Sequence, residues 1–208
     1  MKPEKPAYWD RARRELARRD PVMAAIIRRH PRVHLVPRGE PFQTLARAIV
    51  GQQISVAAAQ SVWNRLSGAA VDVVPERILG LEATRLRACG LSERKCEYIR
   101  DLARRFADGQ VHVHRWSAME DEAVIEDLVQ VRGIGRWTAE MFLIFNLLRP
   151  DVFPLGDLGL QKGLQLAWHG GRKVALATMR RRGETLRPWR SVATWYLWRS
   201  LDPVPVEY

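Results

Sequence analysis

Apolar residues recur along most of this chain at the three-to-four-residue spacing of an amphipathic helix. The clearest face follows Pro41 and consists of Phe42, Leu45, Ala46, Ile49 and Val50. The same spacing, together with helix start signals, predicts helices over about residues 10–19, from 21, over 55–66, 75–81, 92–106, 117–131, 137–148, 158–168 and 173–182, and from 187. With no strand-rich region and no internal repeat, the sequence predicts an all-α fold with little or no sheet.

Local signals refine some of these boundaries. Asp20-Pro21 and Ser92 are typical of helix N-termini. Ser117-Ala-Met-Glu120 has the form of a capping box, which predicts a helix start there. Residues 111–114 alternate apolar and polar, which predicts a brief strand or an extended link. The His-x-His within them lacks a third ligand at metal-site spacing, so we expect no metal there.

The charge of the chain indicates a class of binding partner. The chain has 208 residues, 47% of them hydrophobic and eight of them Trp, and a formal net charge of +11. Such a charge favours a polyanionic partner, although arginine supplies 29 of the 34 basic residues and its abundance can also reflect genomic base composition. The arginines at the start of the chain are most simply a solvated face, with phosphate contact as the alternative: Arg11, Arg13, Arg14, Arg18 and Arg19.

The two cysteines, Cys89 and Cys96, are too few for a disulfide framework or a four-cysteine metal site. Cys96 falls on an apolar helical stripe, which predicts a small core residue rather than a reactive thiol. The chain has no apolar run long enough to span a membrane, and its N-terminus lacks the apolar core of a signal peptide. We therefore expect a soluble intracellular protein.

A glycine-rich turn stands between two predicted helices in the stretch VRGIGRWTA, residues 131–139. Gly133 and Gly135 predict a tight turn with positive φ and with no Cβ in the way of a close partner. Backbone N–H groups of such a turn and of the following helix point outward together, an arrangement that binds phosphate. Downstream, Asp157 is the only acid among the neighbouring apolar residues.

Two adjacent amides, Gln52 and Gln53, interrupt the helical pattern after Gly51. They could merely cap backbone groups, which composition alone favours. Alternatively, they could enter a stacked partner and hydrogen-bond to its bases.

Four stretches together resemble the helix-hairpin-helix/Gly-Pro-Asp (HhH-GPD) superfamily of DNA base-excision glycosylases, most closely its 3-methyladenine DNA glycosylase II (alkylpurine glycosylase) branch. They are IVGQQISV at 49–56, GLSERK at 90–95, LVQVRGIGRWTA at 128–139 with Asp157 downstream, and RPWRS at 187–191. The resemblance covers about residues 20–200. A Gly-Ile-Gly hairpin alone is common among DNA-binding proteins, whereas four motifs in the same order are specific.

The resemblance implies one glycosylase module over residues 1–208 with two lobes and a cleft between them. One lobe would run over about 41–149 and contain the hairpin at 128–139. The other would combine 1–40 with 150–208.

In this family Asp157 matches the catalytic aspartate. A carboxylate there stabilises the oxocarbenium-like sugar that forms when a glycosidic bond breaks, and it can orient or deprotonate the attacking water. A helix N-terminus would favour its negative charge. From the residues alone, an ordinary helix N-cap is the favoured role for Asp157, and only the resemblance reverses this.

The resemblance also implies a subtype and a base pocket. Where bifunctional relatives have a Lys that forms a Schiff base, this chain has Trp137, which implies simple hydrolysis. Trp137 and Trp198 match aromatic walls that stack on cationic alkylated purines. Met141 and Leu158 stand where some relatives have further aromatic residues, so the implied pocket is less aromatic.

Gln53, with Gln52 beside it, matches the wedge that fills the gap left by a flipped nucleotide. The phosphate-binding hairpin would comprise Arg132, Gly133, Ile134, Gly135, Arg136 and Thr138. The resemblance further implies that the backbone carbonyls of Val129, Val131 and Gly133 hold a structural Na⁺ or K⁺ that bridges to a DNA phosphate.

The resemblance thus implies a monofunctional glycosylase that excises alkylated purines, such as 3-methyladenine and 7-methylguanine, from double-stranded DNA and leaves an abasic site. We expect a monomer without a required cofactor or an iron–sulfur cluster, located in the bacterial cytoplasm and associated with the nucleoid. Two alternatives remain: a glycosylase of the same fold for oxidised or deaminated bases, and a non-catalytic hairpin protein that only binds DNA.

Overall fold

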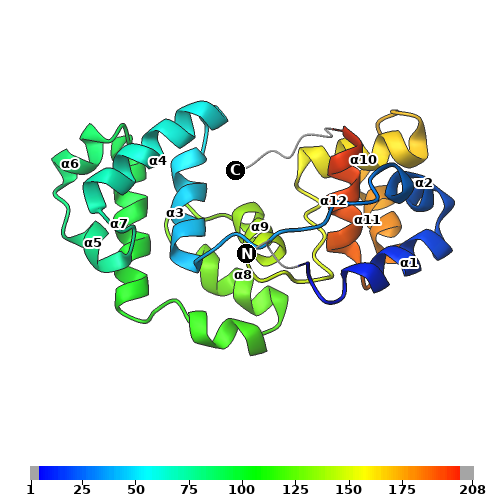
Figure 1. Ribbon diagram of the computed structural model, residues 1–208, viewed down its shortest axis with the longest axis horizontal. Helices are drawn as coiled ribbons and strands as arrows, with labels where there is room; N and C mark the ends of the chain where they lie inside the picture. Colours follow the sequence, from blue (N-terminus) through cyan, green and yellow to red (C-terminus); the bar gives the residue numbers. More distant parts are fainter. Residues whose placement is uncertain (1–4, 202–208) are drawn as a thin grey trace. The chain divides into compact units, whose positions relative to one another are not determined.

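The computed structural model describes residues 5–201, and every regular element in that range is helical (Figure 1). The helices are α1 (Trp9–Arg19), α2 (Pro21–Arg29), α3 (Pro41–Gly51), α4 (Val56–Ala70), α5 (Pro75–Leu79), α6 (Ala83–Ala88), α7 (Glu93–Ala107), the 3₁₀ helix η1 (Val113–Ala118), α8 (Asp121–Val129), α9 (Arg136–Phe145), α10 (Leu158–His169), α11 (Leu176–Thr185) and α12 (Arg190–Leu201). The all-α prediction is therefore confirmed. None of the helices in the described range has both the length and the apolar character that a membrane span requires.

The described residues divide into two compact units. We call residues 5–37 and 143–201 the terminal unit, and residues 38–142 the central unit. The division falls within α9, between Phe142 and Leu143.

In the terminal unit, α12 packs against α1, α2 and α10 (Figure 1). Its buried side chains include Trp195 and Tyr196, and both rings contact the ring of Trp9 from α1. Gly163 permits the close approach of α10, because a Cβ there would lie 3.0 Å from Leu197 Cβ. As predicted, Asp20 caps α2, and its Oδ1 accepts from the N–H groups of Val22 and Met23.

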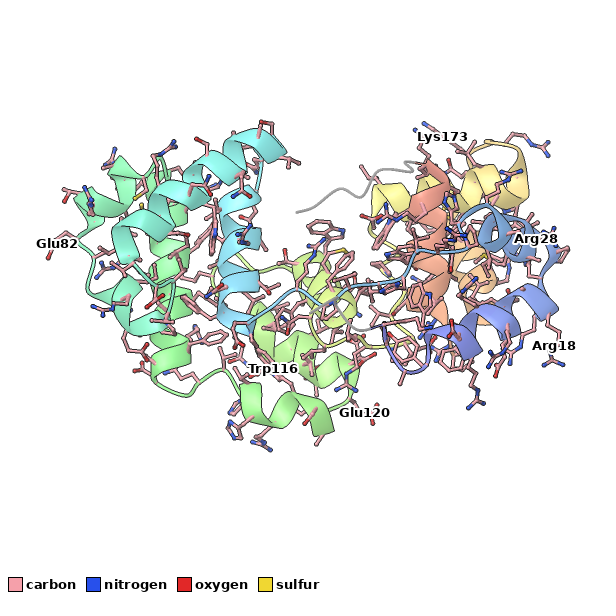
Figure 2. All side chains as sticks on the ribbon, in the orientation of Figure 1. Arg18, Arg28, Glu82, Trp116, Glu120 and Lys173 are labelled. Atoms are coloured by element: carbon pink, nitrogen blue, oxygen red, sulfur yellow. The ribbon has the colours of Figure 1, made fainter. Side chains whose placement is uncertain are left out.

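In the central unit, α3 packs on α4 and α7, and α5 and α6 pack on α7. A chain of edge-to-face aromatic contacts runs from Phe42 through Phe106 and Trp116 to Phe142. Trp116, labelled in Figure 2, is 1% exposed although η1 is a short surface element. Ser92 caps α7 as predicted, and Cys96 is buried in the core.

Three local predictions were wrong. Residues 113–118 form η1 instead of a strand or extended link, because Trp116 Nε1 donates to the buried Asp127 Oδ2 at 2.8 Å and anchors the segment. Ser117 lies inside η1, so the N-cap of α8 is Glu120, which makes no side-chain capping bond.

The third difference concerns two helix ends. The helix after the hairpin ends at Phe145, and Leu148 beyond it has φ +54°. The last helix begins at Arg190, three residues after the predicted start, following a cis Arg187–Pro188 bond.

Candidate functional site

Asp157 is the N-cap of α10, at the end of a short ordered turn. Its Oδ1 accepts from the Leu160 N–H at 2.6 Å, and its backbone N–H donates to Pro154 O at 2.8 Å. Gln161 steadies the turn from the next helical turn, with Nε2 donating to Leu155 O at 2.8 Å. The prediction that Asp157 caps a helix is therefore confirmed. Capping does not exclude the predicted catalytic role, because a helix N-terminus stabilises a carboxylate.

Trp198 of α12 contacts the same carboxylate. Its indole Nε1 donates to Asp157 Oδ1 at 2.8 Å, and its ring stacks on Phe145, with ring centroids 5.8 Å apart and an interplanar angle of 12°. The sequence predicted Trp198 near Asp157 from resemblance alone, and it missed Phe145. The available signal for Phe145 was its position eight residues after Trp137, which places the two at helical spacing.

The other predicted pocket residues are divided between the units. Leu158 follows Asp157 in the terminal unit and is 78% exposed. Trp137 and Met141 belong to the part of α9 in the central unit, and Trp137 is 42% exposed, so much of its ring is accessible to a ligand. The structure joins Trp198 to Asp157 directly, and the grouping of all four pocket residues stays a prediction.

The hairpin is a tight turn between α8 and α9. Gly133 has φ +85°, and a Cβ there would overlap the ring of Tyr98, so both conformation and space require glycine. Gly135 does not have positive φ and faces open space, so the prediction of positive φ was wrong for this residue. Ile134 is buried beneath the turn, and its N–H donates to Val131 O at 3.1 Å.

The polar side chains of the hairpin are largely engaged within the central unit. Arg136 donates to Glu140 at 3.1 Å and to Glu122 at 2.9 Å, and hydrogen bonding to Glu122 holds the pKa of this guanidinium above its usual range. Arg132 pairs with Glu97 at 3.3 Å. Thr138 is 8% exposed. If this element binds an anion as predicted, the binding would rest mainly on the backbone N–H groups at the start of α9, which have no intrahelical acceptors.

Gln52 and Gln53 have different surroundings. Gln52 Nε2 donates to Gly133 O at 2.8 Å, which ties the end of α3 to the hairpin turn. Gln53 is exposed and has φ +59°, a conformation that is uncommon for a residue with a side chain. The capping alternative therefore describes Gln52, whereas the exposed position of Gln53 suits a residue that enters a partner.

Two residues at this loop were missed from the sequence. Lys95 Nζ donates to Val50 O at 2.7 Å, and burial lowers the pKa of this ammonium. Ile54, beside Gln53, is 40% exposed. Lys95 belongs to the motif at 90–95, but only the structure shows that its ammonium caps a carbonyl at the C-terminal end of α3.

The basic residues are unevenly distributed. The terminal unit carries 19 Lys and Arg against six Asp and Glu, whereas the central unit carries 14 of each. Figure 2 labels Arg18, Arg28 and Lys173 of the terminal unit, from three separate segments. Of the predicted surface arginines, Arg11 and Arg19 both pair with Glu15 at 2.9 Å, while Arg14 and Arg18 are exposed.

Among residues 5–201, no three His, Cys, Asp or Glu side chains are grouped so that they could hold a metal ion.

Known proteins share both sequence and fold with this chain. The pattern of the HhH-GPD superfamily, described as base excision DNA repair proteins, matches residues 46–188. DNA-3-methyladenine glycosylase 1 of Schizosaccharomyces pombe is 34% identical over 165 residues, which cover 77% of this chain and 72% of that protein.

Solved structures that are similar in fold include the following two. The S. pombe 3-methyladenine DNA glycosylase in complex with abasic DNA has a TM-score of 0.77 and 30% identity, covering 91% of this chain and 96% of that chain. A DNA-3-methyladenine glycosidase from Bacillus halodurans has a TM-score of 0.79 and 32% identity, covering 88% and 90% respectively.

Proposed function

The chain belongs to the HhH-GPD superfamily of base excision DNA repair proteins, and on that premise we propose that it is a monofunctional DNA glycosylase for alkylated purines. It flips a base such as 3-methyladenine or 7-methylguanine out of double-stranded DNA, hydrolyses the glycosidic bond and leaves an abasic site. It works as a monomer in the cytoplasm, on nucleoid DNA. The observation that carries this proposal is Asp157, held by the start of α10 and by Trp198.

Asp157 supplies the charge that the reaction needs. As the bond between base and sugar breaks, positive charge develops on the sugar, and a fixed carboxylate stabilises that charge. The same group orients the attacking water or accepts its proton. Because two hydrogen bonds fix Oδ1, the carboxylate is oriented before the substrate arrives.

Trp137 limits the reaction to hydrolysis. A lyase reaction requires an amine that attacks the sugar and forms a Schiff base. An indole cannot do this, so the DNA strand is not nicked.

The pocket would combine Trp137 and Trp198 with Met141 and Leu158. Alkylation at N3 or N7 makes a purine cationic, which weakens its glycosidic bond and favours stacking on electron-rich rings. Such a substrate needs little help from a general acid.

The central unit would hold the DNA. The N–H groups at the start of α9 bind a phosphate, and exposed Gln53, with Ile54 beside it, fills the gap in the duplex. Gln52 supports this loop from behind through its bond to Gly133 O, so we assign it a supporting role in place of base contact.

The carbonyls of Val129, Val131 and Gly133 remain candidates for a monovalent cation. Val131 O accepts from Ile134 N–H and Gly133 O from Gln52 Nε2, and each carbonyl oxygen has a second lone pair. Neutral oxygen donors without a carboxylate fit Na⁺ or K⁺. A bound cation would add positive charge at the hairpin beside the DNA phosphate.

A base-release assay tests the function. Methylated, oxidised and deaminated duplexes are incubated with the enzyme, and the free bases are separated by chromatography. We expect release of 3-methyladenine and 7-methylguanine with no strand nicking. Asp157→Asn should lose at least about 100-fold in kcat yet still bind abasic DNA.

Each alternative gives a different result. Release of oxidised or deaminated bases alone would point to the related glycosylase. Salt-dependent DNA binding without release of any base, and unaffected by Asp157→Asn, would point to a protein that only binds DNA.

A further inference from the structure

We infer that Trp198 is a positioning residue for the Asp157 carboxylate, and that Gly159 provides the space in which the two meet. This inference rests on the proposed function, because it assigns a task at the same site. It differs from the role of an aromatic pocket wall, since the task belongs to the indole N–H and not to the ring face.

Two donors converge on one carboxylate oxygen. Asp157 Oδ1 accepts from Leu160 N–H at 2.6 Å and from Trp198 Nε1 at 2.8 Å. Rotation of the carboxylate breaks both bonds, so together they select one orientation. The first donor belongs to the helix that Asp157 caps, whereas the second comes from α12, 41 residues later in the chain.

Trp198 can orient another group because it is itself restrained. The residues before it on α12, Trp195 to Leu197, are buried. The ring of Phe145 stacks on its indole at 5.8 Å, which covers part of one face. Trp198 therefore has at most its other face for a base, while its N–H is already engaged.

Gly159 is where this contact would fail if a side chain were added. A Cβ at residue 159 would lie 3.0 Å from Asp157 Oδ1 and 3.2 Å from both Cδ1 and Nε1 of Trp198. The φ of Gly159 is not positive, so space, not backbone conformation, requires glycine here. One turn further along α10, Gly163 is in the same situation against Leu197. The two glycines form a seam that brings α12 close to the start of α10.

The first experiment removes the N–H and keeps the ring. Trp198→Phe should lower kcat for 3-methyladenine release by about 10- to 100-fold, as expected when a reacting group loses its fixed position. Its Kd for abasic duplex should change by less than about threefold, because the carboxylate and an aromatic ring both remain. Wild-type kcat, or an equal loss in binding and kcat, would contradict the inference.

The second experiment leaves both partners intact. Gly159→Ala should lower kcat by about tenfold, because the new methyl group displaces Asp157 and Trp198 by a few tenths of an ångström. Gly68→Ala is the control: this glycine is also helical, and nothing lies within 4 Å of its Cβ position. Equal kcat in the two variants would count against the seam.

A third measurement needs no catalytic activity. The indole N–H resonance of Trp198, assigned by its absence in Trp198→Phe, should shift and exchange faster with water in Asp157→Ala. If wild type releases no base but this shift occurs, the proposed function fails and the contact stands. If the resonance is the same in both proteins, the positioning role fails.

Discussion

The two units differ in net charge, and in each the charge contrasts with the group that the proposed function requires there. The central unit has as many acidic as basic residues, yet it holds the hairpin whose backbone N–H groups would bind phosphate. The terminal unit has 13 more basic than acidic residues, yet it holds Asp157, the one carboxylate that the proposed reaction requires.

This difference separates two sources of affinity for DNA. Backbone dipoles at a helix N-terminus act over about one turn and depend on geometry. Exposed side-chain charges act over about a Debye length, roughly 10 Å at 0.1 M salt, and depend on salt. The central unit would hold DNA by shape, and the terminal unit would attract it by charge. Asp157 is then an acidic residue within a largely basic unit, where its hydrogen bonds from Leu160 N–H and Trp198 Nε1 keep its carboxyl group ordered.

The largest effect should come from altering the shape of the hairpin. Gly133→Ala places a methyl group into the Tyr98 ring at a φ of +85°. We expect a loss of about 2–4 kcal/mol in the free energy of unfolding and at least tenfold weaker binding of abasic duplex. Urea unfolding and fluorescence anisotropy measure the two quantities.

Gly135→Ala is the matched control, two residues away in the same turn. It meets nothing within 4 Å and has no positive φ, so it should stay within about 0.5 kcal/mol of wild type in stability. If both variants bind abasic DNA equally well, shape is not what the hairpin contributes.

The same two glycines show which features of the structure the sequence predicts and which it does not. The helices follow from apolar spacing, and the caps at Asp20 and Ser92 follow from residue type and position. The Gly-x-Gly pattern predicted the turn but not the different roles of its glycines. Gly133 is fixed by Tyr98, which lies 35 positions earlier in the chain and carries no local mark of that contact.

The candidate site shows the same difference between local contacts, which the sequence predicts, and long-range contacts, which it does not. Asp157 stood out as a lone acid, and its capping bond is local, with donor and acceptor three residues apart. The bonds from Trp198 to Asp157 and from Gln52 to Gly133 span 41 and 81 residues. Packing between helices creates such contacts, so a pattern along the chain cannot specify them. The capping box at Ser117 was wrong for a related reason: Asp127, on the following helix α8, fixes η1 through a bond from Trp116 that spans 11 residues.

Asp127 should give an effect of intermediate size, on the stability of the central unit. Burial alone would raise the pKa of this carboxyl, but hydrogen bonds from Trp116 and His112 outweigh it and lower the pKa below its ordinary value. A folded-state pKa below the unfolded one stabilises the unit above the unfolded pKa of about 3.9. That contribution is lost as the pH falls through the lower, folded-state pKa.

Asp127→Asn should therefore lower the free energy of unfolding by about 1–3 kcal/mol at pH 7, and by less near pH 3. Urea unfolding at pH 3, 5 and 7, followed by tryptophan fluorescence, measures this difference. Asp108→Asn, at an exposed position, is the control. A loss that is the same at all three pH values would show that the charge of Asp127 is not what stabilises the unit.

The smallest effect, and the most direct test of the comparison, comes from removing equal charge from each unit. One variant changes Arg28, Arg29, Arg172 and Lys173 to Gln in the terminal unit. The other changes Arg77, Arg85, Arg87 and Arg104 to Gln in the central unit. All eight residues are exposed, so neither set disturbs a core.

Binding of an undamaged duplex is then measured by anisotropy from 50 to 200 mM salt, which requires no catalysis. Removing charge from the terminal unit should weaken binding by about 3- to 10-fold at 50 mM salt, and the affinity should then depend less on salt concentration. Removing charge from the central unit leaves it with 10 basic and 14 acidic residues. Binding should still change by no more than about twofold, because on this proposal its backbone N–H groups, and not these four side chains, hold phosphate. Equal losses would mean that DNA responds only to the total charge of the chain. A larger loss from the central unit would mean that its side chains, as well as its backbone, contact phosphate, and the division between shape and charge would have to be abandoned.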